Sequence, residues 1–303
     1  MNKVLIAEYT IFSDPSLSAE GEAMLSSLKK SFENCGYEVV SPEDGNFNSE
    51  IERLAPECDY GLVIAPDHLL SKFTHTLELA THNLGSDSTS TAVCANKRLS
   101  SKLLENAGIK VPRETDSNYT GKRVIKPIRG AGSLRVRIAK DGEMPADDEM
   151  SVEYIVGDHY SVSIVGSRVI GDACEFYSGL PPVFLTVNKQ NSYPDENGSF
   201  VYKGGETPVH PQREAEIIKT ARRALEILGC QGYTGIDIID SPDGIYVVDV
   251  NARPTMSLIG ITKVIEEEIA DVLLKATVGQ PPECVHYNGK TAYFDESGGV
   301  SVK

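Results

Sequence analysis

Alternating apolar and polar residues predict a β-hairpin near the C-terminal end of the chain. Residues 234–251 read T-G-I-D-I-I-D-S-P-D-G-I-Y-V-V-D-V-N, with stretches rich in Ile, Val and Tyr on both sides of a turn sequence. Pro242 suits a type I turn, and Gly244 suits the left-handed residue that closes a three-residue loop. Such a loop would pair Ser241 with Ile245.

The predicted hairpin brings two acidic side chains together. Counting outward from the turn, Asp237 lies opposite Asp249, and Asn251 shares the face of Asp249. The other face would carry the core residues Ile236, Ile238, Tyr246, Val248 and Val250. Because like charges across a sheet destabilise it, we expect a divalent cation between the acids. Two carboxylates and an amide oxygen suit Mg²⁺ rather than zinc, and the alternative is a solvated face with two accidental acids.

The N-terminal pattern predicts a βαβ unit. Apolar runs at residues 3–8 and 60–65 are typical of buried strands, and a shorter strand is expected at 37–40. One face of an intervening helix that ends at Gly36 would carry Met24, Leu25, Leu28 and Phe32. Strands that alternate with helices favour a parallel sheet, which we expect to extend to about residue 88.

The rest of the chain mixes helices with short strands. Helices are expected at 91–107, where Leu99 and Leu103 share a face, from Pro211 to Gly229, and at 257–278. Strands are expected at 123–127, 134–139, 151–156, 159–165 and 168–176. Residues 178–208 contain two adjacent prolines and two glycine-containing turn signals, and we interpret them as a long, partly mobile excursion.

Composition narrows the class of partner. A net charge of −15 and a pI of about 4.9 argue against nucleic acid or an anionic membrane as the main partner. No apolar run approaches the length of a membrane span, and the N-terminus has no signal-peptide layout. The six cysteines are scattered without a C-x-x-C pair, so we expect a reduced, cytoplasmic protein with free thiols.

A second candidate site is V-I-K-P-I-R-G-A-G-S, residues 124–133. Lys126 lies on a predicted strand, and the turn that follows contains Gly130 and Gly132 and ends in Ser133. Glycines let backbone N–H groups approach an anion closely, and the lysine neutralises it. The alternation of the next strand makes the turn the tip of a hairpin, either a flap over phosphates or an ordinary tight turn.

A third candidate is V-E-Y-I-V-G-D-H-Y-S-V-S-I, residues 152–164. Its backbone groups would pair with the edge of a purine while Ile155 covers the ring. Asp158 or His159 would reach a ribose hydroxyl. By itself, the stretch is equally a strand interrupted at Gly157.

In order and spacing, these stretches resemble the ATP-grasp superfamily. The matching sequences are A-N-K-R-L-S-S-K-L-L-E-N-A-G-I-K-V-P, V-I-K-P-I-R-G-A-G-S, E-Y-I-V-G-D-H, and G-I-D-I-I-D with V-V-D-V-N-A-R-P. The resemblance covers residues 90–260 well and the N-terminal unit loosely. It implies an α/β and α+β protein with the ATP-grasp fold: an N-terminal parallel α/β (pre-ATP-grasp) domain at 1–88, subdomain A at 89–150, and subdomain B with the hairpin at 151–303.

The resemblance also implies a role for each candidate residue. Lys97 and Lys126 would contact the α- and β-phosphates of ATP, and Gly130, Ala131, Gly132 and Ser133 would cover the γ-phosphate. Glu153, Tyr154, Ile155 and Val156 would form the adenine hinge, with Asp158 or His159 at the ribose. Asp237, Asp249 and Asn251 would bind two Mg²⁺ ions, or Mn²⁺ in their place. Arg253 would meet a carboxylate or acyl phosphate and, with Lys126, would be catalytic.

Two positions depart from the family pattern. Asp249 stands where the family usually has Glu, so its side chain is one methylene shorter. Gly235 stands where many relatives carry Arg, two residues before the first metal carboxylate. Arg253 would therefore carry more of the charge stabilisation.

The implied chemistry is carboxylate activation: ATP phosphorylates a carboxylate, and an amine attacks the acyl phosphate to form an amide. The stretches A-E-Y…S-D-P-S-L-S-A-E-G-E-A-M-L-S-S-L and R-P-T-M-S-L-I-G-I resemble the archaeal tyramine–glutamate ligases of methanofuran biosynthesis, which implies glutamate and tyramine as substrates. The alternatives are another amino-acid ligase, such as one that joins lysine to a second amino acid, a carboxylase-type enzyme, and a non-catalytic ATP-binding regulatory protein.

Several acids are candidates for the amine site. Glu8 and Glu20 would meet an ammonium group at the end of the first strand, where α/β sheets bind ligands. In the alternative, Ser18 caps the following helix and Glu20 interacts with the helix dipole. Glu206 is a further candidate.

Small molecules are the expected partners. A homodimer is possible only on the general ground that it is the commonest oligomer of soluble enzymes. His68, His75 and His82 recur every seven residues, too far apart for a metal site, and are expected on a solvated helical face.

Overall fold

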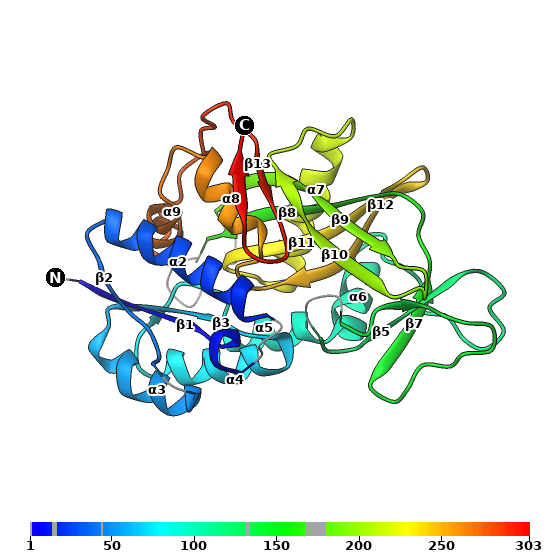
Figure 1. Ribbon diagram of the computed structural model, residues 1–303, viewed down its shortest axis with the longest axis horizontal. Helices are drawn as coiled ribbons and strands as arrows, with labels where there is room; N and C mark the ends of the chain where they lie inside the picture. The colour runs from blue at the N-terminus through cyan, green and yellow to red at the C-terminus, as the bar shows by residue number, and fades with distance from the viewer. Residues whose placement is uncertain (1, 14–16, 44, 131–133, 168–179) are drawn as a thin grey trace.

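In the computed structural model, three sheets and the helices that cover them build the part of the chain that the structure describes (Figure 1). The structure describes residues 2–13, 17–43, 45–130, 134–167 and 180–303. Within these ranges, no helix combines the length and the apolar character that crossing a membrane requires.

The helices are α1 (Thr10–Ser13), α2 (Ser18–Asn34), α3 (Phe47–Leu54), the short 3₁₀ helix η1 (Ala55–Glu57), α4 (Asp67–Glu78), α5 (Ser88–Ala95), α6 (Lys97–Asn106), α7 (Glu214–Leu228), α8 (Ser257–Val264) and α9 (Ile269–Thr277). The strands are β1 (Lys3–Glu8), β2 (Glu38–Val40), β3 (Tyr60–Ile64), β4 (His82–Asn83), β5 (Arg123–Pro127), β6 (Arg137–Ile138), β7 (Glu149–Glu153), β8 (Asp158–Gly166), β9 (Val183–Pro194), β10 (Phe200–Thr207), β11 (Gly232–Ser241), β12 (Gly244–Asn251), β13 (Ala292–Phe294) and β14 (Val300–Val302).

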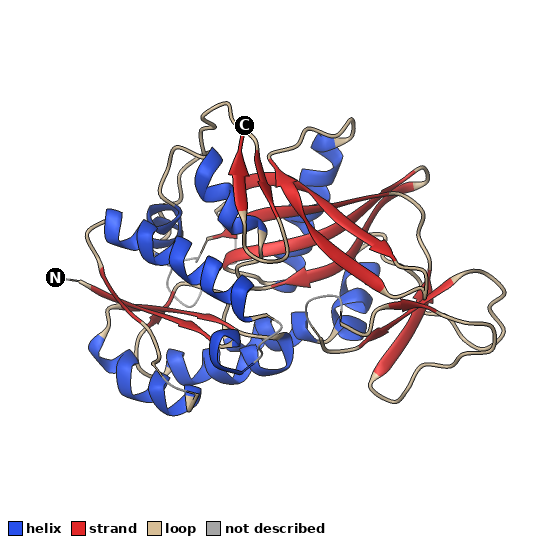
Figure 2. Cartoon of the chain, viewed as in Figure 1, coloured by secondary structure: helices blue, strands red, loops and turns tan. Residues whose placement is uncertain are grey.

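A parallel sheet in the order β2-β1-β3-β4 forms the N-terminal unit, which confirms the predicted sheet. Side chains alternate along β1: Val4 and Ile6 pack with α2, whereas Leu5 and Ala7 pack with α3 and α4. Helices therefore cover both faces of this sheet (Figure 2). The carboxyl ends of β1 and β3 meet at one edge, where α/β sheets commonly bind ligands.

The largest sheet is antiparallel and runs β12-β11-β8-β9-β10-β13-β14. The prediction of a long, mobile excursion at 178–208 is wrong, because β9 and β10 occupy most of that segment as a hairpin. Alternating Val183, Leu185 and Val187 are buried along β9, and Asn197-Gly198 lies in the turn. The strand predicted at 168–176 lies outside the described residues.

Two of the three helices predicted beyond residue 88 are interrupted, whereas the helix predicted from Pro211 to Gly229 is the single helix α7. The expected 91–107 helix is α5 and α6, because Asn96 between them is extended and its side chain accepts a hydrogen bond from the N–H of Leu99 at 3.2 Å. Leu99 and Leu103 remain exposed, 41% and 37% respectively, so their shared face is not the buried one. The helix expected at 257–278 is divided into α8 and α9, because the backbone of Ile265, directly after α8, is extended.

The N-terminal unit shares a hydrophobic core with the C-terminal helices. The cluster that joins α2, α8 and α9 includes Met24, Leu28, Phe32, Leu258, Ile261, Val272 and Leu273. Beside it, Ser31 and Asn34 donate hydrogen bonds to the Glu268 carboxylate at 2.6 and 2.7 Å. Helix α2 lies between the parallel sheet and α8 and α9 (Figure 1).

A three-stranded sheet, β6-β5-β7, lies at the end of the molecule opposite the N-terminal unit (Figure 1). Strands β5 and β6 pair antiparallel, which confirms the hairpin predicted after Lys126. The second strand is shorter than the predicted 134–139, because Arg135 has a positive φ of 63° that breaks the extended run.

Candidate active site

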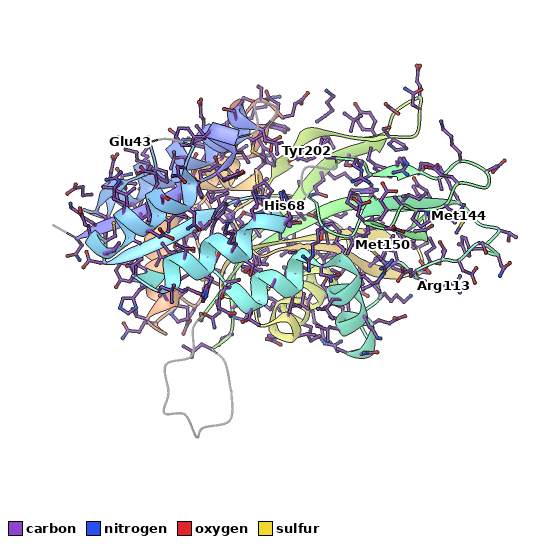
Figure 3. The ribbon with its side chains drawn as sticks, turned by 90° about the horizontal axis from the view of Figure 1, so that it is seen from below. Glu43, His68, Arg113, Met144, Met150 and Tyr202 are labelled. Carbon is purple, nitrogen blue, oxygen red and sulfur yellow. The ribbon has the colours of Figure 1, made fainter. Side chains whose placement is uncertain are left out.

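A cavity of about 600 Å³ is bordered by the seven-stranded sheet, the three-stranded sheet and α2. Side chains from α2, the central strands β8 to β12, and the β5–β7 sheet line it. Figure 3 shows Tyr202, one of the lining residues, between the end of the molecule marked by Glu43 and the end marked by Met144 and Arg113. Cavities of this size are typical of small-molecule sites.

The hairpin that carries the acids is β11 paired with β12, but its turn differs from the prediction. Ser241 pairs with Gly244 across a two-residue loop, not with Ile245. A bulge at Val248 then shifts the register, so Asp237 nevertheless lies opposite Asp249.

The bulge also exchanges side chains between the two faces of β12. Ile245 and Val247 join the core cluster with Ile236, Ile238 and Val250, whereas Val248 lines the cavity. The prediction that Tyr246 and Val248 belong to that core face is wrong, because it assumed uninterrupted alternation along the strand.

The Asp237 carboxylate is partly buried and held by amide groups on both of its oxygens. Gln190 donates to Oδ1 at 2.8 Å, and Asn251 donates to Oδ2 at 3.2 Å. Burial and the facing Asp249 carboxylate raise the pKa of Asp237 to about 7. If the side-chain amide of Asn251 rotates by a half-turn, its oxygen faces the two carboxylates. Two carboxylates and an amide oxygen fit Mg²⁺ or Mn²⁺, and a bound cation would offset the repulsion between Asp237 and Asp249.

Lys97 is almost fully buried, with its ammonium group between two carboxylates. It donates a hydrogen bond to Asp249, and its Nζ lies 3.5 Å from Oδ2 of Asp67. Although burial disfavours the charge, Asp249 and Asp67 raise the pKa of Lys97. In the same way, Lys97 and Lys126 lower the pKa of Asp249 in spite of its burial. The side chain predicted to contact phosphates therefore keeps Asp249 ionised in this structure.

Arg253 lies on the other side of Asp67. Its Nε is 3.6 Å from Oδ1 of Asp67, and its Nη1 donates to the carbonyl of Pro254 at 3.2 Å. The Nε is buried and has no hydrogen-bond partner among the described residues, and the side chain lines the cavity. A guanidinium in this position can bind a carboxylate.

Lys126 points from β5 toward the bulge in β12. Its ammonium donates to the carbonyl of Val248 at 2.9 Å, and burial lowers the pKa of Lys126 to about 8. The bulge thus turns a backbone oxygen toward this lysine.

The predicted phosphate flap is only partly within the described residues. Gly130 lines the cavity, and Ala131, Gly132 and Ser133 lie outside the described residues. Just beyond, Arg135 and Arg137 also line the cavity, although both bind Glu149, at 2.9 and 2.8 Å.

The predicted adenine hinge divides into two groups. Glu153, Tyr154 and Ile155 line the cavity, whereas Val156 is 68% exposed and does not. The N–H groups of Glu153 and Tyr154 already donate to carbonyls of Arg113 and Lys122. A purine would therefore pair with backbone groups beyond Tyr154.

Of the two residues predicted for the ribose, only His159 lines the cavity. Asp158 is an exposed partner of Lys189, with 2.7 Å between the charged atoms. Burial lowers the pKa of His159, which favours the neutral ring.

Of the three acids proposed for the amine site, only Glu20 lines the main cavity. Glu8 accepts hydrogen bonds from the hydroxyl of Thr10 at 2.7 Å and the N–H of Ile11 at 3.0 Å. Glu20 lines the cavity, whereas Glu206 on β10 does not.

Two details of the N-terminal pattern were predicted incorrectly. Ser18 is the first residue of α2 rather than its N-cap, and Leu17 takes the cap position without a side-chain hydrogen bond. His68, His75 and His82 are exposed as expected, but His82 lies on β4 rather than on the helix of the other two.

Asp67 and Gln190 are among the residues of the site that escaped prediction. Asp67 follows the carboxyl end of β3, and that position in a parallel sheet is the signal that was available. Gln190 lies in the segment interpreted as an excursion, so its strand had to be recognised first.

Comparison with known proteins places this geometry in a family. A family model described as the ATP-grasp domain matches residues 94–257. The chain is 27% identical to the tyramine–L-glutamate ligase of Methanocaldococcus jannaschii, over 90% of this chain and 88% of that protein.

Solved structures agree. An ATP-grasp superfamily protein from Archaeoglobus fulgidus superposes with a TM-score of 0.75 at 27% identity, covering 97% of this chain and 92% of that one. The D-alanine–D-alanine ligase of Bacillus anthracis, solved with ATP, has a TM-score of 0.61 at 20% identity, over 84% and 87% of the two chains, and shares the fold. Since the family match spans more than half of the sequence, the chain belongs to the ATP-grasp family, and it is an ATP-dependent carbon–nitrogen ligase.

Proposed function

We propose that this ligase joins the γ-carboxylate of glutamate to the amine of tyramine, with release of ADP and phosphate. The observation that carries the proposal is one continuous cavity lined by Lys126 and the hairpin acids and also by Arg253 and Glu20. A nucleotide, a carboxylate and an amine would each meet a complementary group in it. Similarity to a tyramine–L-glutamate ligase along almost the whole chain supports this choice of substrates.

In this proposal, the chain mainly positions its substrates. Ile155 and His159 would contact the nucleoside, and Lys126 would neutralise phosphate oxygens. Asp237, Asp249 and Asn251 would hold Mg²⁺, which supplies positive charge beside the γ-phosphate. Lys97 would have to exchange Asp249 for phosphate oxygens in order to reach the nucleotide.

Arg253 would bind the glutamate γ-carboxylate in line with the γ-phosphate, so that a carboxylate oxygen attacks phosphorus and forms an acyl phosphate. The amine then attacks the acyl carbon, and phosphate leaves. Orientation and charge stabilisation account for most of the rate in such transfers.

The direct test is ADP release with Mg·ATP, glutamate and tyramine, with each substrate omitted in turn. Release that requires all three, with a product of the mass of γ-glutamyltyramine, is the expected result. ADP release only with other amino acids, such as lysine and a second amino acid, would show that the proposed substrates are wrong and that the protein is still a ligase. Tight Mg·ATP binding without release for any acid and amine would favour a regulatory ATP-binding protein instead.

A further inference from the structure

Glu20 is an acid that the described chain leaves without a partner. It projects from the first turn of α2 into the cavity, and no hydrogen bond or ion pair engages it among the described residues. Its neighbour Glu8 is satisfied by Thr10 and Ile11, so it is Glu20 that remains available to a ligand.

The cavity wall around Glu20 is apolar. Leu17 and Met24 of the α2 region line it from one side, and Tyr202, Met256 and Phe294 line it from β10, the start of α8 and β13. Met24, Met256 and Phe294 are nearly inaccessible to solvent and so are fixed by the core. The hydroxyl of Tyr202 has no partner in the described chain, and burial followed by the nearby Glu20 charge raises the pKa of this phenol.

The cavity wall carries charges of both signs. Lys126, Arg135 and Arg137 are cations of the main cavity, where a nucleotide would lie. Glu20 and Glu8 border a small side cavity of about 50 Å³, with Arg253 as the cation. Since Arg253 and Glu20 line both the side cavity and the main one, these two charged groups lie where the cavities adjoin.

We propose that Glu20 binds the ammonium group of the acceptor amine and takes its proton, while Met24, Tyr202 and Phe294 pack against the body of that amine. The acceptor is then a primary amine with an apolar or aromatic body. With Arg253 occupied by the glutamate γ-carboxylate, a carboxylate beside the amine nitrogen would face only Glu20 and Glu8, so the acceptor has none there. This inference rests on the proposed function and specifies its second substrate by chemical class.

The proton transfer balances without a further reactant. The R–NH₃⁺ group gives one proton to the Glu20 carboxylate, and the freed nitrogen lone pair attacks the acyl carbon. The C–O bond to the phosphate breaks, the leaving phosphate takes the electron pair and a second proton, and the amide nitrogen keeps the third. Burial raises the pKa of Glu20 to about 7, which suits a group that accepts a proton near neutral pH.

The test separates acyl-phosphate formation from use of the amine. Hydroxylamine is small enough to trap a glutamyl phosphate as the hydroxamate without occupying the apolar wall. We would measure hydroxamate formation and kcat/KM for tyramine, 2-phenylethylamine and L-lysine in the wild type, Glu20→Gln and Tyr202→Leu, with Glu22→Gln as the matched control. Glu22 lies on the same turn of α2 but is exposed.

The expected result is a fall of about 10²-fold in kcat/KM for both aromatic amines in Glu20→Gln, the lower end of the range for a general base. Hydroxamate formation should stay within about twofold of wild type, and Glu22→Gln should match wild type in both assays. Tyr202→Leu should raise KM for the aromatic amines more than it lowers kcat.

Two results would overturn the inference, and they differ from each other. Intact hydroxamate formation with unchanged amine kinetics in Glu20→Gln would remove Glu20 from the amine site while keeping the proposed ligase. No hydroxamate from wild type with glutamate or any other carboxylic acid would reject the proposed function and, with it, the amine site.

Discussion

Asp67 connects two cations that line the cavity, Lys97 and Arg253. Its carboxylate lies 3.5 Å from Lys97 and 3.6 Å from Arg253, and all three side chains are buried or nearly so. Removing one partner of a buried ion pair leaves an uncompensated charge, which costs more than the pair contributes.

Arg253→Met should therefore lower both turnover and stability. We expect turnover to fall by about 10²–10³, the usual effect of losing one charge-stabilising donor. The free energy of unfolding should fall by roughly 3 kcal/mol, because Asp67 would retain only Lys97. Turnover assays and urea denaturation measure the two effects.

The double variant Asp67→Asn/Arg253→Met separates the two effects. Most of the stability should return, because no buried charge is left unpaired, but turnover should not. Recovery of turnover in the double variant would mean that Arg253 acts only through Asp67.

Asp237→Asn should abolish turnover and leave the fold intact. Burial and Asp249 both disfavour the Asp237 charge, so its removal should not lower the melting temperature in a chelator-treated sample. In the wild type, added MgCl₂ should raise the melting temperature, because a ligand that binds only the folded state stabilises it. A variant that still shows this Mg²⁺-dependent rise would remove Asp237 from the metal site.

At the scale of residues, the sequence predicted which side chains belong to the site but not which groups they contact. Asp237 and Asp249 were placed opposite each other because strand periodicity fixes that relation, and Lys126 was placed on its strand. The partner of Lys126 is a carbonyl turned outward by the bulge at Val248, and no local pattern encodes it. Lys97 similarly meets Asp67, 30 positions earlier in the chain, only through the tertiary fold.

The small β6-β5-β7 sheet depends on one buried acid. Glu149 accepts two hydrogen bonds from Arg137, at 2.8 and 3.1 Å, and one from Arg135 at 2.9 Å. With these partners, the pKa of Glu149 falls to about 2. Because this value is below the unfolded value of about 4.3, the contribution to stability is present above about pH 4.3 and is lost as pH falls toward 2.

Glu149→Gln should therefore reduce stability at pH 7 and flatten its decline in acid. Urea denaturation at pH 7, 5, 4 and 3 would measure both effects, with Glu105→Gln as an exposed control without these contacts. Parallel acid profiles for Glu149→Gln and wild type would mean that other carboxylates cause the acid sensitivity.

At the scale of elements, strong periodicity identified most strands and helices, and interruptions were missed. The 91–107 helix breaks at Asn96, whose side chain caps α6, and a cap inside an apolar pattern is easily read as continuous helix. The 178–208 segment was misread because its glycines and prolines outweighed the alternation along β9. There, burial between β8 and β10 stabilises a strand that its turn residues alone do not predict.

Across the whole molecule, the N-terminal unit and the C-terminal helices are not independent. The domain boundaries at residues 88 and 150 stay a prediction, but the main core cluster contains residues from both sides of residue 88. An isolated fragment 89–303 would expose apolar surface on α8 and α9 that α2 now covers.

The full chain should therefore unfold in one cooperative transition, seen as coincident curves from far-UV circular dichroism and tyrosine fluorescence. Fragment 89–303 should lose that transition and bind a hydrophobic dye.

In the full chain, Glu268→Ala removes the acceptor for Ser31 and Asn34, and each hydrogen bond to a charged group contributes about 1.5–3 kcal/mol. The variant should shift the single transition to lower denaturant as a whole, because the contact lies between segments that share one core. Two separate transitions, in either the wild type or Glu268→Ala, would show that the N-terminal unit folds independently and that the shared core contributes little to cooperativity.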